Sequence, residues 1–469
     1  MSLEQSTQAE VQAPASSARK ILRRVSRSLL NLKKITHQPH KRITLDYDAI
    51  AQAMEYLALP DLLRTMATCR PLYDLGIPIL LRDVRFVRVR GNYQPRFLLY
   101  QKHFLNNPVR FAWVQSLVCP SIALDDRIST QFLAMPRNFT SLRALDIDIN
   151  GAKVDGYLSR WILSLERLRE LKIQNVGAHS KQQMILVRRM SSRLTVLHIS
   201  TTRFMRAQSR FYPLRALANS LYSLSFECSH TEGGPAISHN NNLSFPAVQE
   251  LTWISAEVVL AGTLISVFPG LRRLNIGNPM LESERAMTDR DIPADAMLSL
   301  RLHNRSMQHC CRARWESLDV LRGSPVTLWT LGLRCQAARL ETHLFNGFEK
   351  PGYTLAILHD AWPEHLVLGV STKGDVPLDR VLDFPSLRVV ELTFTMGDSE
   401  DTTEIIAIMQ DAFNQMYRPC LRRLTITVET WLTVFNSGKW LDSLQGLPHG
   451  EPFIKRPPVK RGFPARWRA

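Results

Sequence analysis

The sequence predicts an α/β fold, a right-handed solenoid in which short parallel strands alternate with helices. Two observations predict it. The template apolar-x-x-apolar-x-apolar occurs eight times, and several segments between its copies have apolar residues at helical spacing. The template ends as a strand does, with alternate side chains on one face. One such strand cannot bury its apolar face alone, whereas stacked neighbours can.

The copies of the template begin 28, 26, 26, 27, 27, 23 and 26 residues apart. This spacing lies in or next to the period of roughly 20–29 residues found in leucine-rich repeats. We therefore expect a leucine-rich-repeat solenoid over residues 86–445, regular over 114–303 and irregular over 304–445. The copies are Val114/Leu117/Cys119, Leu142/Leu145/Ile147, Leu168/Leu171/Ile173, Leu194/Leu197/Ile199, Leu221/Leu224/Phe226, Val248/Leu251/Trp253, Leu271/Leu274/Ile276 and Met297/Leu300/Leu302.

Helices are expected between the strands, because apolar residues recur there with helical periodicity. The clearest sets lie within residues 158–165 and 260–268. Proline follows phenylalanine in three copies of a short phrase, at 245–246, 268–269 and 384–385, where it should end a helix and lead into the next strand. Later strands are expected at Leu328/Leu331/Leu333, 366–370, Leu387/Val390/Leu392 and Leu421/Leu424/Ile426.

The capping residue and prolines within residues 43–85 predict a three-helix unit. Asp46 is placed to cap the first helix, and Pro60 and Pro71 suit the first turns of the second and third. Pro78 is expected to end or kink the third helix. A unit of this size buries little apolar surface by itself, so it should dock on a partner protein or on the solenoid.

The run LDYDAIAQAMEYLALPDLLRTMATCRPLYDLGIPILLRDV resembles an F-box, in the divergent form found in fungal F-box/leucine-rich-repeat proteins. It departs from that pattern at Asp46, where F-boxes usually have proline. The resemblance implies that the unit binds a Skp-type adaptor and so joins a cullin-based ubiquitin ligase. The alternative is that the same residues form only a helical cap. The implied adaptor-binding residues are Leu45, Ile50, Leu57, Pro60, Leu62 and Leu63.

In each repeat, the residue between the last two apolar positions should point away from the core, onto the exposed face of the sheet. Stacked repeats make an extended surface that suits a protein ligand. We expect a protein substrate to contact this column, although an ordinary solvated face has the same pattern. The candidate substrate-binding residues are Asp146, Lys172, His198, Ser225, Thr252, Asn275 and Arg301.

The net charge of +17 is concentrated at the two ends. Residues 1–42 carry +7 and residues 455–469 carry +6, and we expect 1–42 and 446–469 to be disordered. The basic stretch 18–35 fits a nuclear-localisation or nucleic-acid patch, a membrane-surface helix, a mitochondrial presequence or a solvated arm. Nucleic-acid binding is therefore an alternative function, but the nearly balanced charge between the ends argues against it.

No nucleotide-binding, hydrolase or metalloprotease motif occurs, so we expect a recognition protein without catalytic residues, cofactor or metal. His303, His309, Cys310 and Cys311 fit no zinc template. The seven cysteines include no Cys-x-x-Cys, which suggests reduced thiols and a cytoplasmic or nuclear location. No apolar run approaches the roughly 18 residues of a membrane span, and the first residues do not resemble a signal peptide.

Overall fold

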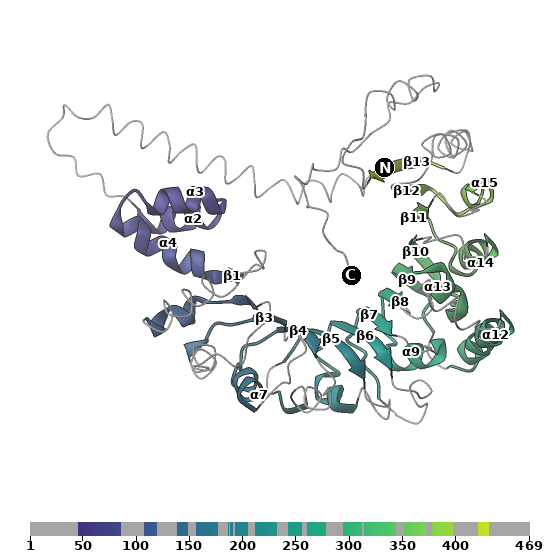
Figure 1. The fold of residues 1–469 in the computed structure, drawn as a ribbon, viewed down its shortest axis with the longest axis horizontal. Helices are drawn as coiled ribbons and strands as arrows, with labels where there is room; N and C mark the ends of the chain where they lie inside the picture. Colours follow the sequence, from purple (N-terminus) through teal and green to yellow (C-terminus); the bar gives the residue numbers. More distant parts are fainter. Residues whose placement is uncertain are drawn as a thin grey trace, which may run out of the picture. The chain divides into compact units, whose positions relative to one another are not determined.

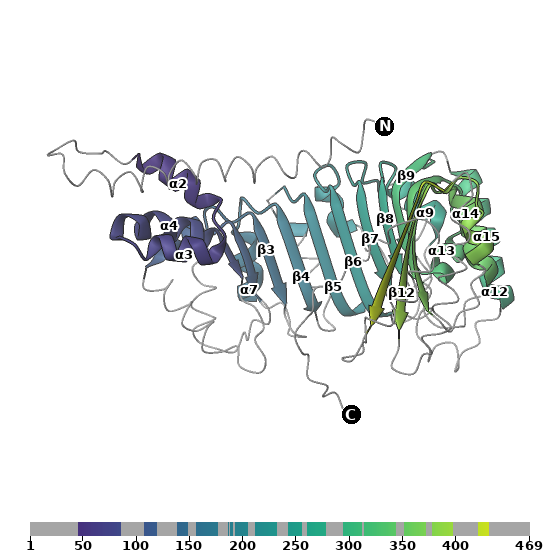
Figure 2. The same ribbon diagram turned by 90° about the horizontal axis from the view of Figure 1, so that it is seen from above.

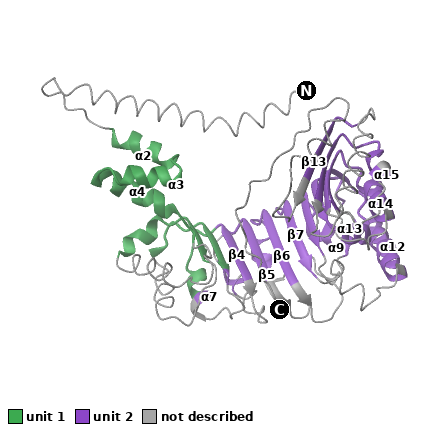
Figure 3. Cartoon of the chain, turned by 45° about the horizontal axis from the view of Figure 1, so that its top comes forward, with its two compact units in different colours: residues 1–147, 160–168 green, residues 148–159, 169–469 purple. Residues whose placement is uncertain are grey.

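The chain divides into two units, residues 1–147 with 160–168 (unit 1) and residues 148–159 with 169–469 (unit 2), as Figure 3 shows. The two expected basic ends lie outside the described residues, as does Leu45. The computed structural model describes residues 46–85, 107–119, 138–148, 156–176, 186, 188–190, 193–204, 212–231, 243–255, 260–277, 294–311, 314–343, 351–371, 378–396 and 421–430.

The described part of unit 1 starts with the three expected helices, α2 (Tyr47–Glu55), α3 (Leu59–Met66) and α4 (Arg70–Arg82). The Asp46 carboxylate accepts hydrogen bonds from the first free amides of α2, as an N-cap does. Proline lies in the first turns of α3 and α4, as expected. Pro78 does not end the third helix, because α4 continues through it to Arg82. Asp74, whose carbonyl loses its helical partner there, is solvent-exposed and can be hydrated instead.

A small apolar core holds these helices together. Met54, Leu62 and Met66 form its buried centre, and partly buried apolar residues of all three helices pack around them. Gly76 of α4 permits this close packing, since a Cβ atom built on it would lie 2.3 Å from Cγ of Met66. The three helices therefore form a core of their own, but a small one.

The strands that follow are parallel, and in each unit their order in the sheet is their order in the chain. Every apolar residue of the first seven template copies is at most 3% exposed, so the predicted α/β arrangement of parallel strands is confirmed for these copies. Unit 1 contains β1 (Asp83–Arg85), β2 (Ser116–Cys119), nearly all of β3 (Ala144–Asp148) and the short 3-10 helix η1 (Pro108–Trp113). Unit 2 contains β4 (Glu170–Val176), β5 (Val196–Phe204), β6 (Ser223–Thr231), β7 (Glu250–Ser255), β8 (Arg273–Gly277), β9 (Ser317–Gly323), β10 (Gln336–His343), β11 (His365–Ser371), β12 (Val389–Met396) and β13 (Arg423–Thr430).

Helices connect these strands. The helical segments expected within 158–165 and 260–268 are α7 (Gly156–Leu163) and α9 (Ala261–Val267). In unit 2 the α-helices lie on one face of the sheet, and no described α-helix of that unit covers the opposite face (Figures 1 and 2). Besides α9, unit 2 contains η3 (Tyr212–Leu217), α12 (Ala294–Cys310), α13 (Pro325–Leu331), α14 (Pro351–Ala361) and α15 (Leu378–Leu382).

Two expected strands are helices instead. The eighth template copy lies in α12, and Leu328 and Leu331 lie in α13. An apolar-x-x-apolar pair also fits one face of a helix, so the template alone does not separate the two structures. The strand paired with β8 is β9.

The template itself continues through β9 and β10, in a region expected to be irregular. Leu274 of β8 pairs in register with Leu321 of β9, which in turn pairs with Leu340 of β10. The two strands therefore carry the template as Leu318/Leu321/Gly323 and Ala337/Leu340/Thr342. Glycine is required at the last position of β9, since a Cβ on Gly323 would lie 2.4 Å from the carbonyl oxygen of Ile276. The template requires an apolar residue at its last position, so it does not detect β9 and β10, which have Gly323 and Thr342 there.

Candidate interaction surfaces

Helix α3 has two apolar faces, and only one of them is buried. Leu62 and Met66 point into the three-helix core and are 4% and 5% exposed. Leu59 and Leu63, also four residues apart, are 57% and 47% exposed. Residues four apart share a helical face, so this pair forms an apolar stripe on the surface of unit 1. Exposed apolar side chains grouped in this way can serve as a contact surface for another molecule.

The structure separates the six predicted adaptor-binding residues into different environments. Leu63 and Pro60 are exposed, whereas Ile50 and Leu57 are partly buried against the three-helix core. Leu62 belongs to that core, so its side chain holds the helices together and is not available at the surface. Leu45 lies outside the described residues.

Sequence reasoning missed most of the apolar surface of the three helices. Besides Leu59 and Leu63, the unit exposes Tyr47, Tyr56 and Tyr73 by about half. Tyrosine is common in protein interfaces because it combines a large apolar ring with a hydroxyl that tolerates water. The sequence did contain a signal for this surface: α3 has more apolar residues than one buried helical face can hold.

Five residues of the predicted substrate-binding column lie on the sheet of unit 2, over β4 to β8. These residues pair in register from strand to strand and are half-buried. They alternate with buried apolar residues and therefore face away from the helices of that unit. Asp146 has the equivalent place on β3, in register with Val118. The column in unit 2 is Lys172, His198, Ser225, Thr252 and Asn275.

The prediction for Arg301 is wrong, because this residue lies in α12 and not on a strand. The position next to Asn275 in the column belongs to Arg322 of β9. Arg301 is 5% exposed and pairs with the carboxylate of Asp360, which also binds Arg305. Burial lowers the pKa of Arg301, and the nearby positive charge of Arg305 adds to this effect. Arg301 is a buried structural residue, so it is unavailable to a substrate on the sheet.

The buried face of α12 is polar, and it satisfies the ends of two other helices. Arg301 donates to the carbonyl of Trp329, and Asn304 donates to that of Thr330 with a distance of 2.9 Å. Both carbonyls lie in the last turn of α13, where helical partners are missing. The Asn304 side-chain oxygen also accepts from the amide of Ala261, the first residue of α9.

Beyond Arg322 the column continues in register as Glu341, Val367 and Glu391. The two glutamates pair with Arg339 and His365 of the neighbouring row. Arg339 donates to Glu341 at 2.6 Å, and His365 lies 2.9 Å from Glu391. The first pair lies within β10 and the second joins β11 to β12, while Arg339 also lies 3.7 Å from Glu391. Burial, followed by the charge of Arg339, lowers the pKa of His365. This part of the sheet surface is polar, with each carboxylate next to an arginine or histidine.

The described residues contain no group of three or more His, Cys, Asp or Glu side chains placed to hold a metal ion. Among the described helices, none is both long enough and apolar enough to span a membrane. No protein-family model matches this chain, and a search of curated proteins finds no match either. The functional interpretation therefore depends on the two surfaces, the apolar stripe of α3 and the polar sheet face.

Proposed function

We propose that this protein is the substrate-recognition subunit of an SCF-type cullin ubiquitin ligase. The three-helix unit would bind a Skp-type adaptor, and the repeats would bind a protein substrate. Such a subunit needs no catalytic residues, because it brings the substrate close to a conjugating enzyme supplied by its partners. Its location would be the cytoplasm, the nucleus or both.

The exposed pair Leu59 and Leu63 is the observation that supports adaptor binding most directly. A helix that serves only as a cap needs one apolar face, directed toward its own unit. Helix α3 has a second one, and it lies within the stretch that resembles an F-box. Full burial of an exposed leucine is worth about 1.5–3 kcal/mol, and these two side chains, already about half buried, have roughly half of that left to contribute each.

The open sheet face of unit 2 supports the substrate-binding part of the proposal. Its outward side chains lie in register on consecutive strands, so a partner lying across the strands would meet one after another. Polar side chains dominate, which suits the polar contacts that fix orientation and specificity in a transient complex.

The decisive experiment measures binding of a purified Skp-type adaptor to the full chain by isothermal titration calorimetry. We expect Leu59→Asp and Leu63→Asp each to weaken binding at least about tenfold, because each places a charge in an apolar interface. Leu302→Asp is the matched control. It makes the same change on α12 of unit 2, at a side chain with the same 57% exposure as Leu59. This variant should bind the adaptor as the wild type does.

Two results would contradict the proposal. A folded wild-type protein that does not bind the adaptor would leave the three helices as a cap on a ligase-independent scaffold. If Leu63→Asp and Leu302→Asp weaken adaptor binding equally, then the assay responds to the added charge and not to the apolar stripe of α3. Leu62 is unsuitable for this test, since any charge there disrupts the helical core.

A further inference from the structure

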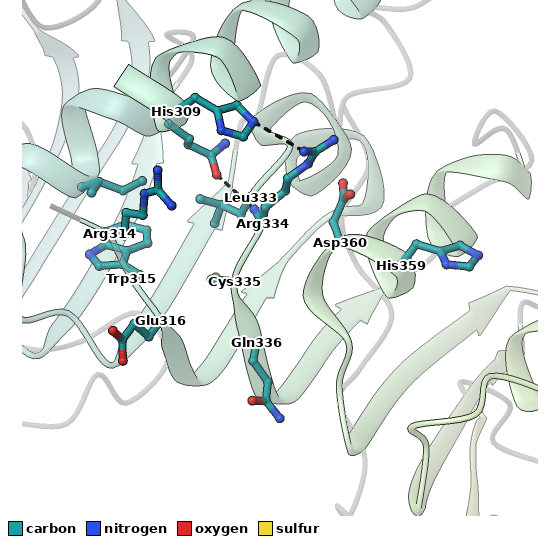
Figure 4. A pocket seen from close by; sticks show the side chains of 12 residues that line it. His309, Arg314, Trp315, Glu316, Leu333, Arg334, Cys335, Gln336, His359 and Asp360 are labelled. Carbon is teal, nitrogen blue, oxygen red and sulfur yellow. Dashed lines mark hydrogen bonds between the residues drawn. The ribbon is translucent and has the colours of Figure 1, made fainter. Parts of the chain in front are cut away.

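Unit 2 contains a cleft of about 640 Å³ where β9 and β10 begin (Figure 4). The C-terminal ends of α12 and α14 and the segments that enter the two strands line it. Its size lies within the range of about 300–1,000 Å³ typical of ligand sites. None of the residues predicted from the sequence to bind adaptor or substrate lines this cleft.

The charges in and behind the cleft are mainly positive. Arg314 and Arg334 line it and are exposed, and neither has a carboxylate partner among the described residues. Asp360 also lines it, but Arg301 and Arg305 occupy both of its oxygens. Glu316 is the remaining acid in the lining. Four arginines against two carboxylates leave an excess of two positive charges.

The surroundings reinforce this positive potential. Nε of Arg305 is buried and has no hydrogen-bond partner, so this guanidinium is incompletely satisfied. The charge of Arg334 is close enough to contribute to lowering the pKa of Arg301, after the larger effect of burial. An anion bound in the cleft would relieve these unfavourable interactions between like charges.

Both segments that carry Arg314 and Arg334 are held in place. The indole of Trp315, next to Arg314, is buried and donates to the carbonyl of Phe268 at 2.8 Å. The backbone amide of Arg334 donates to the side chain of Gln308 at 3.0 Å. These contacts fix the backbone of both segments before any ligand arrives, which lowers the entropic cost of binding.

We propose that this cleft binds an acidic polypeptide segment of a partner protein, with carboxylates pairing to Arg314 and Arg334. The two guanidinium groups come from different segments and do not point at one another (Figure 4). Separate cations suit an extended chain with several acidic side chains better than one compact anion. The inference concerns unit 2 alone, so it does not depend on whether unit 1 binds an adaptor.

The experiment measures fluorescence anisotropy of a fluorescein-labelled oligoglutamate peptide with the full chain. We expect Arg314→Glu/Arg334→Glu to weaken binding at least about tenfold, because both cations are replaced by repelling charges. The charge-matched control is Arg380→Glu/Arg388→Glu, at exposed residues of unit 2 outside the cleft. This control should stay within about twofold of the wild type, since exposed charges at a distance are largely screened by salt.

A neutral variant guards against misfolding of the charge-reversed protein. Arg314→Gln/Arg334→Gln should also weaken binding and should reduce its dependence on salt concentration. Absence of saturable binding by the wild type would overturn the proposal, as would equal weakening in the cleft and control variants, which would assign binding to the net charge of the chain.

A second peptide distinguishes carboxylate from phosphate. A phosphoserine peptide that binds more than about tenfold tighter than oligoglutamate, with the same dependence on Arg314 and Arg334, would reassign the cleft to phosphorylated segments. Weaker or similar binding of the phosphoserine peptide supports the acidic segment proposed here.

Discussion

Helices α3 and α12 expose apolar side chains for opposite reasons. Helix α3 is apolar on both faces, with Leu62 buried in the core and Leu63 exposed. Helix α12 buries the polar residues Arg301 and Asn304 and exposes leucines at 298 and 302. The difference lies in their neighbours. The buried face of α3 meets apolar side chains, whereas that of α12 meets the unpaired backbone groups at the ends of α9 and α13.

This comparison changes how exposed leucines are interpreted. On α3 the exposed pair is additional to an apolar core, and the adaptor-binding proposal depends on it. On α12 the exposed leucines accompany a buried polar face that completes two other helices. Three predictions test these assignments by measuring what each buried face contributes to stability.

The largest effect is expected from Arg301→Glu on α12. The change removes a buried partner of Asp360 and adds a second negative charge beside it, which should cost about 5 kcal/mol in free energy of unfolding. Urea unfolding followed by circular dichroism measures it. Lys172→Glu, on the sheet face, should change stability by less than about 0.5 kcal/mol. Equal urea midpoints for the two variants would show that Arg301 is not a buried structural residue.

A smaller effect is expected from Leu62→Ala on α3. Truncating this core side chain should destabilise the three helices by about 3 kcal/mol, through lost apolar burial and a cavity. Hydrogen exchange should therefore become faster in α2, α3 and α4 and stay unchanged in unit 2. Leu63→Ala should leave exchange in these helices nearly unchanged. If the amides of these helices exchange equally fast in the Leu62→Ala and Leu63→Ala variants, then the assignment of a buried and an exposed face to α3 is wrong.

The smallest effect is expected from Asn304→Ala on α12. The variant leaves the amide of Ala261 and the carbonyl of Thr330 without their partners, which should cost about 2 kcal/mol. Hydrogen exchange at the first turn of α9 should become faster. Gln308→Ala is a useful comparison, since its contacts with Gly332 and Arg334 lie farther along the same face. If exchange in α9 does not change, then Asn304 does not cap that helix.

The strands were largely predictable because their signal is local. In copies such as Leu197/Ile199 and Leu251/Trp253, alternation of apolar residues is enough to define which side chains enter the core. The same reasoning failed where the core accepts other residues. Gly323 and Thr342 occupy inward positions of β9 and β10, and Gly323 is there because a neighbouring backbone leaves no room for a side chain.

The candidate site was less predictable than the fold. The outward column from Lys172 to Asn275 follows from periodicity, but Arg322 and its charged neighbours depend on finding β9 and β10. The cleft at Arg314 and Arg334 involves residues whose side chains meet only when α12, α14 and two strand entries come together. No pattern within a single segment predicts such a site.

The sequence by itself determined the strands and inward apolar residues of the first seven repeats, and the three N-terminal helices with the Asp46 cap of the first. These features depend on residue periodicity and on contacts within a few positions of the chain. Only the tertiary structure decided that Leu62 is buried while Leu63 is exposed, and that Arg301 lies inside with Asp360. Each outcome depends on which groups from distant segments surround the side chain, because burial and charge pairing are properties of the assembled neighbours.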